Sequence, residues 1–239
     1  MRSRTRPVLR WLSIGVGAAA AAYATYASLA WLRYGHPSRS TQDNHDPLLD
    51  RFMPIYDVVE RHHIGVRAPA DVTFVAACGV DLMQSPLARS IFKAREVILG
   101  SEPDTTVRPR GILALTQSLG WGVLAEESGR EIVMGAVTKP WEANVVFRAL
   151  LPDEFAAFDE PGYVKIAWTL RADPHGPAES TFSSETRAIA TDASARSRFR
   201  RYWALLSPGI IVIRWMMLMP VKRAAETLTV SREAGQANP

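Results

Sequence analysis

The stretch that decides the fold is residues 199–221, FRRYWALLSPGIIVIRWMMLMPV. Its apolar residues recur at steps of three or four, a spacing that predicts one long helix with a continuous apolar face. These residues are Phe199, Trp203, Leu206, Ile210, Ile213, Met217 and Val221. Asp192 is a typical N-cap for this helix, and Pro208-Gly209 predicts a kink or a break within it.

A strand pair is predicted directly before this helix. In the segment Tyr163–Arg171, apolar Val164, Ile166 and Trp168 alternate with other residues, which indicates a half-buried antiparallel strand. Residues 174–177 (PHGP) then turn the chain, and residues 180–191 are expected to return beside the first strand. The long helix thus follows an antiparallel sheet.

Earlier segments supply the rest of an α+β domain. Residues 56–66 predict a strand that stops before Pro69. A helix is expected from Pro69 to Cys78, and a second begins with Ser85 as N-cap and ends at Gly100. Further strands are expected at residues 112–119, 121–126 and 131–137, and at either 145–150 or 155–158.

This order resembles the helix-grip arrangement of the SRPBCC superfamily, which includes START lipid-transfer domains and polyketide cyclases. A closer likeness to uncharacterised bacterial members lies in the segments PGYVK (161–165), ETR (185–187), FRRYW (199–203), IR (213–214) and KRAAE (222–226), and it spans Phe52 to Glu226. The resemblance implies a curved antiparallel sheet wrapped on the long C-terminal helix, with a cavity for a hydrophobic ligand between them. Fold alone does not fix function.

We therefore expect a lipid or another hydrophobic small molecule as partner. Methionines on the long helix suit adaptable apolar contacts, although each also suits a closed core. The candidate ligand-binding residues are Lys165, Trp168, Glu185, Arg187, Tyr202, Leu206, Ile210, Ile213 and Met217. A cyclase or dehydratase is the alternative, with Glu185, Tyr163 or Arg187 as acid–base or oxyanion groups. An interaction module without a pocket is a third hypothesis.

Glu185 and Arg187 are two residues apart in a strand and therefore share a face. If that face is the concave one, they hold a ligand's polar head together with Lys165 or Arg214. If it is not, they form a structural ion pair, since a buried charged pair is costly unless it is satisfied.

Composition excludes several other classes. Six of the 28 basic residues precede every acidic one, and from Ser40 onward 22 basic residues face 24 acidic ones. The folded part thus lacks the basic excess of a nucleic-acid binder. The single cysteine, Cys78, lies in an apolar stretch and indicates a buried small residue. Adjacent His62 and His63 point to opposite faces of a strand, so no metal site and no cofactor is expected.

The N-terminal region predicts a membrane anchor. Residues 1–34 combine a basic head with an uncharged run from Trp11 to Leu32, long enough for a transmembrane helix. The positive-inside bias places the N-terminus in the cytoplasm and the domain outside it. A cleaved signal peptide, giving a secreted domain, is the alternative. A linker (35–51), the ligand-binding domain (52–228) and a flexible tail (229–239) follow, and the sequence leaves the oligomeric state open.

Overall fold

The computed structural model describes residues 5–40, 45–102 and 109–236. In these ranges, an antiparallel sheet has the strand order β3-β8-β7-β5-β4, with the short β6 paired to β5. The strands are β3 (Val58–Val66), β4 (Gly122–Glu127), β5 (Glu131–Thr138), β6 (Phe147–Arg148), β7 (Val164–Pro174) and β8 (Ser180–Ala190). The first long strand thus pairs with the last, which brings residues more than a hundred positions apart together.

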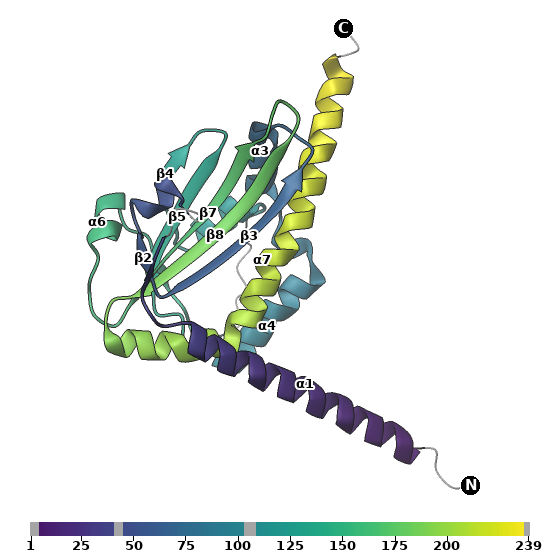
Figure 1. Cartoon of the computed structure of the whole chain (residues 1–239), viewed down its shortest axis with the longest axis vertical. Coiled ribbons are helices and arrows are strands. Elements are labelled where there is room, and N and C mark those ends of the chain that lie inside the picture. The colour runs from purple at the N-terminus through teal and green to yellow at the C-terminus, as the bar shows by residue number, and fades with distance from the viewer. Residues whose placement is uncertain (1–4, 41–44, 103–108, 237–239) are drawn as a thin grey trace.

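The long helix α7 (Ala193–Gln236) lies along one face of this sheet, as Figure 1 shows. The backbone N–H of Ala195 donates to the Asp192 carboxylate at 2.9 Å, so the predicted N-cap is confirmed. The helix changes direction in its first half, in keeping with Pro208 in its interior. It continues to Gln236, so the segment expected to be a flexible tail is helical at residues 229–236, whereas residues 237–239 lie outside the described ranges.

Four further elements lie on the α7 side of the sheet. They are α3 (Ala70–Gly79), the 3-10 turn η2 (Leu82–Gln84), α4 (Pro86–Leu99) and α5 (Ile112–Ser118). Ser85 caps α4 through the backbone N–H of Ala88, and Gly100 ends it with φ of 68°, as predicted. The core on this side includes Val72, Leu170, Phe182 and Met217.

The segment 112–119, predicted as a strand, is the helix α5. Gly111 has φ of 85° and its carbonyl accepts from Leu115 N–H, which starts the helical turn. The Thr116 hydroxyl bonds back to the Ile112 carbonyl at 2.6 Å. Short apolar runs fit both structures equally well, so periodicity did not decide this one.

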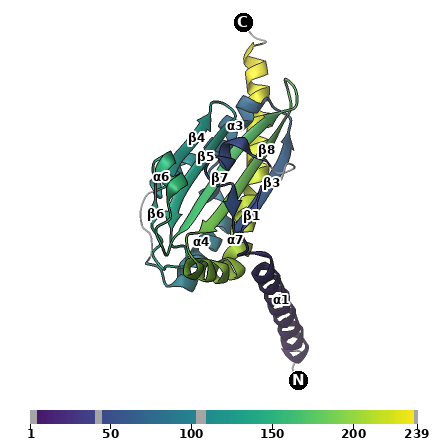
Figure 2. The same cartoon turned by 60° about the vertical axis from the view of Figure 1, so that its left-hand side comes forward.

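The opposite face of the sheet is also covered. Figure 2 shows α6 (Pro152–Ala157) and the segment around β1 (Ser38–Arg39) in front of it. The elements α2 (Pro47–Asp50) and β2 (Ile55–Tyr56) complete this layer, and their residues Leu49 and Tyr56 are buried, as is Met53 between them. Residues 35–51 are therefore not a free linker where the structure describes them. For the same reason β7 is buried on both faces rather than half-buried.

The N-terminal helix α1 (Thr5–Arg33) projects from the domain, but its last turns pack against α7 (Figure 1). The Tyr26 hydroxyl lies 2.9 Å from the buried Ser207 hydroxyl, and the Tyr23 hydroxyl donates to the Leu205 carbonyl. The Arg200 guanidinium lies 4.4 Å from the centroid of the Trp31 ring. The end of α1 is thus part of the domain's packing. Residues 1–4 of the basic head lie outside the described ranges.

Candidate functional site

A cavity of about 260 Å³ lies between the sheet and α7, and α4 and α5 contribute further walls. Its volume is near the lower end for small-molecule sites. From the sheet it is lined by Ile166, Trp168 and Thr186, and from α7 by Phe199, Tyr202, Trp203, Ile210, Ile213, Arg214 and Met217. The lining from η2, α4 and α5 includes Met83, Phe92, Ile112 and Leu115. Most of the wall is therefore apolar.

The helical repeat of α7 explains which of its residues line the cavity. Ile213 and Arg214 lie three and four residues after Ile210 and four and three residues before Met217, so all four share the face turned to the sheet. Val212 and Trp215 lie on the other side and are exposed. An arginine thus occurs within the otherwise apolar inward stripe.

Arg214 is the charged group that α7 contributes to this cavity. Its guanidinium lies 5.1 Å from the centroid of the Trp168 ring and 3.4 Å from the Ser184 hydroxyl. Among the described residues, no carboxylate lies within salt-bridge distance of Arg214. Burial lowers the pKa of Arg214 to about 10, which still leaves the side chain positively charged at neutral pH. The cavity therefore presents, beside an aromatic wall, a cation that has no carboxylate partner among the described residues.

The structure brings five of the nine predicted site residues together. Trp168, Tyr202, Ile210, Ile213 and Met217 all line the cavity. Leu206 instead lines a neighbouring hollow, together with Ile98, Leu99 and Tyr202.

The other three, Lys165, Glu185 and Arg187, lie on the opposite face of the sheet. Successive strand residues alternate between faces, and the cavity takes Ile166, Trp168 and Thr186. The Lys165 ammonium donates to the Ala156 carbonyl at 2.8 Å, under α6. These three residues therefore do not line this cavity.

Arg187 is fully buried in a structural ion-pair network. It donates to the Glu185 carboxylate at 2.6 Å, to the Asp50 carboxylate and to the Met53 carbonyl at 2.7 Å. The Arg61 guanidinium binds the same Glu185 at 2.8 Å. Of the two readings of the Glu185–Arg187 pair, the geometry thus favours the structural one.

Sequence reasoning missed the walls from α4, α5 and the neighbouring loops, among them Phe92, Leu115 and Trp121. The apolar stripe of α4 was visible in the sequence. Its place opposite α7 was not, because that depends on how non-neighbouring segments pack.

The described part of the chain gives little support for a metal site or for a nucleophilic cysteine. No group of three or more His, Cys, Asp or Glu residues there is arranged to hold a metal ion. Cys78 is partly buried, and burial raises the pKa of its thiol to about 11, which disfavours the nucleophilic thiolate.

Within the described ranges, one helix is long and apolar enough to cross a membrane by length and composition, the Ala193–Arg232 part of α7. Its apolar window is 28% buried. A core helix can meet the same criteria of length and composition as a membrane span. The α7 helix packs on α3, β3 and β8, as a core helix does.

One strand, a set of helices, an antiparallel sheet and a long C-terminal helix laid across it define a helix-grip α+β domain. Here that domain contains an apolar cavity.

No protein-family model matches the chain, and no curated protein matches it. Among solved structures, it is similar to a protein from Chromobacterium violaceum (14% identity, 65% of this chain, 96% of the other, TM-score 0.25). It is also similar to norcoclaurine synthase from Thalictrum flavum (10% identity, 81% of this chain, 98% of the other, TM-score 0.27). A third similar structure is the Zhui aromatase/cyclase from Streptomyces sp. R1128 (10% identity, 72% of this chain, 95% of the other, TM-score 0.22). At these TM-scores the likenesses carry over no ligand and no reaction.

Proposed function

We propose that this chain is a membrane-anchored binding domain for a lipid or another hydrophobic small molecule that carries an anionic group. The observation that carries the proposal is Arg214, a cation without a carboxylate partner among the described residues, in the apolar cavity beneath α7. The apolar part of the ligand would occupy the space beside Ile166, Ile213 and Met217.

Arg214 is partly buried between α7 and the sheet, where its charge loses part of its hydration. A cation that is removed from water is unfavourable unless an opposite charge or hydrogen-bond acceptors compensate it. Ser184 supplies one distant acceptor, and the Trp168 ring supplies a cation–π contact. A ligand carboxylate or phosphate would add the strong, charge-assisted hydrogen bonds that the guanidinium lacks.

The membrane part of the proposal rests on α1. The uncharged run from Trp11 to Leu32 has 22 residues, which spans about 33 Å as a helix and fits a hydrocarbon layer. Its last turns, from Tyr23 onward, pack on α7, so the part of α7 around Leu205 would lie at the outer boundary of that layer. With the basic head on the cytoplasmic side, the domain would lie outside the cytoplasm. Packing of Tyr23, Tyr26 and Tyr34 on α7 favours a retained anchor over a cleaved signal peptide, because cleavage after Ala24 or Ala30 would remove some of these contacts.

The geometry does not favour the enzyme alternative. Glu185 and Arg187 are engaged with each other on the far side of the sheet, and Tyr163 packs there against Phe158. Among the described residues that line the cavity, there is no Asp, Glu, His or Cys that would act as acid, base or nucleophile.

The test compares two tryptophan substitutions one residue apart in α7. Ile213→Trp fills the cavity, whereas Val212→Trp places the same ring on the exposed side. The full-length protein is purified in mild detergent, and its bound small molecules are measured by native mass spectrometry. A fluorescent long-chain carboxylate then measures binding directly.

We expect wild type and Val212→Trp to carry an acidic, lipid-sized adduct and to bind the probe, and Ile213→Trp to do neither. A wild-type protein that carries no adduct and binds no probe would overturn the proposal. Equal binding by Ile213→Trp and wild type would place the ligand elsewhere.

A further inference from the structure

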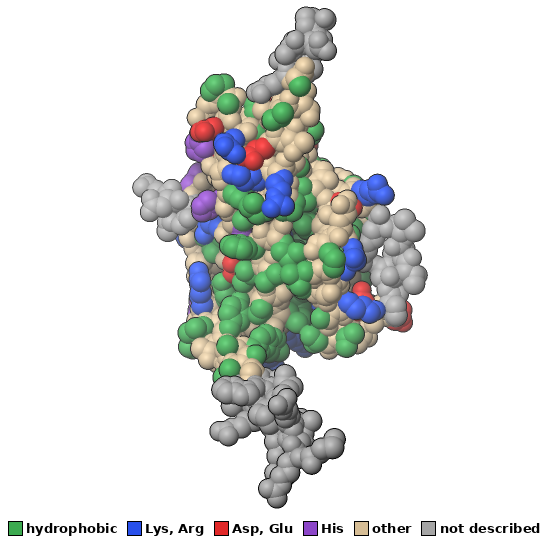
Figure 3. All heavy atoms as spheres, turned by 90° about the vertical axis from the view of Figure 1, so that its right-hand side faces the viewer, with side chains coloured by type: hydrophobic (Ala, Val, Ile, Leu, Met, Phe, Trp, Pro, Cys, Tyr) green, Lys and Arg blue, Asp and Glu red, His purple; other side chains and the backbone are tan. Residues whose placement is uncertain are grey.

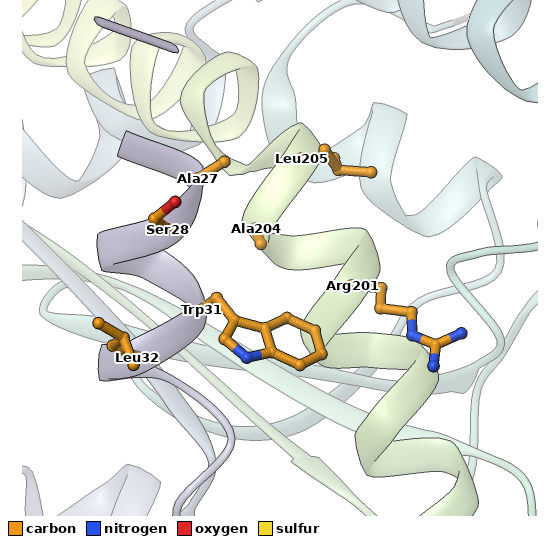
Figure 4. A pocket seen from close by; sticks show the side chains of 7 residues that line it. All are labelled: Ala27, Ser28, Trp31, Leu32, Arg201, Ala204 and Leu205. Carbon is orange, nitrogen blue, oxygen red and sulfur yellow. The ribbon is translucent and has the colours of Figure 1, made fainter. Parts of the chain in front are cut away.

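Two apolar hollows lie on the surface at the end of the domain where α1 joins α7, and the second of them adjoins the cavity. The first lies between these two helices and is lined by Trp31, Leu32, Ala204 and Leu205. Figure 4 shows the Trp31 ring projecting from α1 toward α7, with Arg201 on the far side. The second hollow lies between the end of α4 and α7.

Shared residues connect the three spaces into a series. Arg201 and Leu205 line both surface hollows. Tyr202 lines both the second hollow and the cavity, so its side chain stands between them. The series therefore leads from the surface of α1, past Leu205 and Tyr202, to Arg214.

We propose that an amphiphile enters the cavity sideways from the lipid bilayer along this series of hollows, with Tyr202 as the side chain that must move to admit it. The inference rests on the proposed function, and adds the source of the ligand and its path.

The bilayer is the source because the first hollow is built in part from α1 itself. Leu29 and Leu32 of α1, Leu205 of α7 and Ile98 of α4 are all exposed apolar side chains at this end. Figure 3 shows hydrophobic side chains spread over the lower part of the face formed by α7 and α1. Apolar surface of this kind, continuous with a membrane-spanning helix, is suited to contact with lipid rather than water.

Arginine side chains lie along the proposed path. Arg198 and Arg201 line the second hollow and are exposed, and no carboxylate of the described residues lies within salt-bridge distance of either. Cations beside a bilayer attract anionic headgroups. An anionic amphiphile thus meets Arg201 first and Arg214 at the end, while its chain stays against apolar walls.

The experiment measures transfer of a pyrene-labelled long-chain carboxylate to the full-length protein in nanodiscs. The probe is placed either in the nanodisc lipid or, as monomers, in the buffer. Leu205→Glu puts a carboxylate into the path at a side chain that is 54% exposed. Leu228→Glu is the matched control, since Leu228 is 41% exposed on the same helix and lines none of the three hollows.

We expect Leu205→Glu to slow transfer from the bilayer by about tenfold, with the Kd of the probe unchanged, because the barrier rises in both directions. Leu228→Glu should transfer the probe at the wild-type rate, and Tyr202→Ala should speed transfer. Thermal unfolding of each variant checks that it is folded. An unchanged transfer rate in Leu205→Glu, with probe binding intact, would overturn the path alone. A wild-type protein that binds no probe by either route would overturn the proposed function.

Discussion

The Arg214 guanidinium lies over the face of the Trp168 ring, 5.1 Å from its centroid, and this pair joins the long helix to the sheet inside the cavity. Trp168 is itself buried and borders Trp121 across the same wall, with ring centroids 6.4 Å apart. Aromatic contact partly compensates a desolvated cation but does not neutralise it. A charge therefore remains available to a ligand.

Substitutions of Arg214 should distinguish the contribution of its charge to ligand binding from its contribution to the shape of the cavity. Arg214→Met is expected to weaken binding of a long-chain carboxylate by roughly 10- to 100-fold, because a charge-assisted hydrogen bond contributes about 1.5–3 kcal/mol. The long-chain alcohol of the same chain length should bind wild type and Arg214→Met with equal affinity. Arg214→Lys should keep part of the preference for the carboxylate over the alcohol. Competition against a fluorescent probe measures the affinity of each protein for each ligand. Equal loss of alcohol and carboxylate binding would mean that Arg214 only shapes the cavity.

Removal of the Asp50 charge should destabilise the fold without touching the cavity. Arg187 is fully buried, and Asp50→Asn would leave Glu185 as the one carboxylate among the described residues that is paired with its guanidinium. We expect a loss toward the lower end of about 3–5 kcal/mol, the usual cost of breaking a buried pair. The exposed Asp159→Asn is the control, with a change below about 0.5 kcal/mol. Urea unfolding in detergent measures both, and similar values for the two would contradict the network's role.

The same network has a pH dependence of known sign. Burial alone would raise the pKa of Asp50, but hydrogen bonds from Arg187 and Ser40 hold it below its ordinary value. The contribution of Asp50 to stability is therefore complete above its unfolded-state pKa and is lost as the pH falls through the folded-state value.

Glu131 should give the opposite pH dependence. Burial, together with the nearby Asp46 carboxylate, raises its pKa to about 8. Between the unfolded-state value of 4.5 and about 8, the folded protein holds a proton that the unfolded chain releases, so stability falls as the pH rises. Glu131→Gln should remove this slope and be more stable than wild type at pH 8.5. Unfolding curves at pH 5 and 8.5 test it, with the exposed Glu179→Gln as control. A slope that persists in Glu131→Gln would assign it to another group.

A pair of glycines tests how tightly the wall near Trp121 is packed. Gly120 has φ of 96°, and a Cβ there would lie 2.2 Å from the Phe147 carbonyl oxygen. Gly162 has φ of 87° but open space around it. Both alanine variants should lose about 1–2 kcal/mol through backbone conformation, and Gly120→Ala should lose clearly more, because a backbone atom cannot move aside easily. Comparable melting temperatures for the two would contradict this close approach.

Local sequence signals predicted most of the elements. The caps Ser85 and Asp192, the terminating Gly100 and the alternation in residues 163–171 each act within a few residues, and the structure has the corresponding helix ends and strand. The prediction of a strand at α5 was wrong because the apolar run is too short for its periodicity to distinguish a strand from a helix. The expectation of a linker at residues 35–51 rested on their polar composition, which does not show that Leu49 is inserted into a core.

The candidate site divides in the same way. The stripe that holds Ile210, Ile213 and Met217 follows from the helical repeat, so the sequence placed these residues on one face. The alternation of β8 likewise put Glu185 and Arg187 together. The sequence did not show whether that shared face was the cavity side. This depended on which alternate residues of β8 face α7, and on the segment around α2, which covers the other face of the sheet.

The sequence by itself determined an α+β chain with an apolar N-terminal helix and an amphipathic C-terminal one, since periodicity and capping are properties of neighbouring residues. Only the tertiary structure decided which charges meet. It buried Arg187 against Asp50, left Arg214 without a carboxylate partner in the described chain, and packed α1 against α7. The physical reason is that desolvation and ion pairing depend on distances between residues that the sequence keeps far apart.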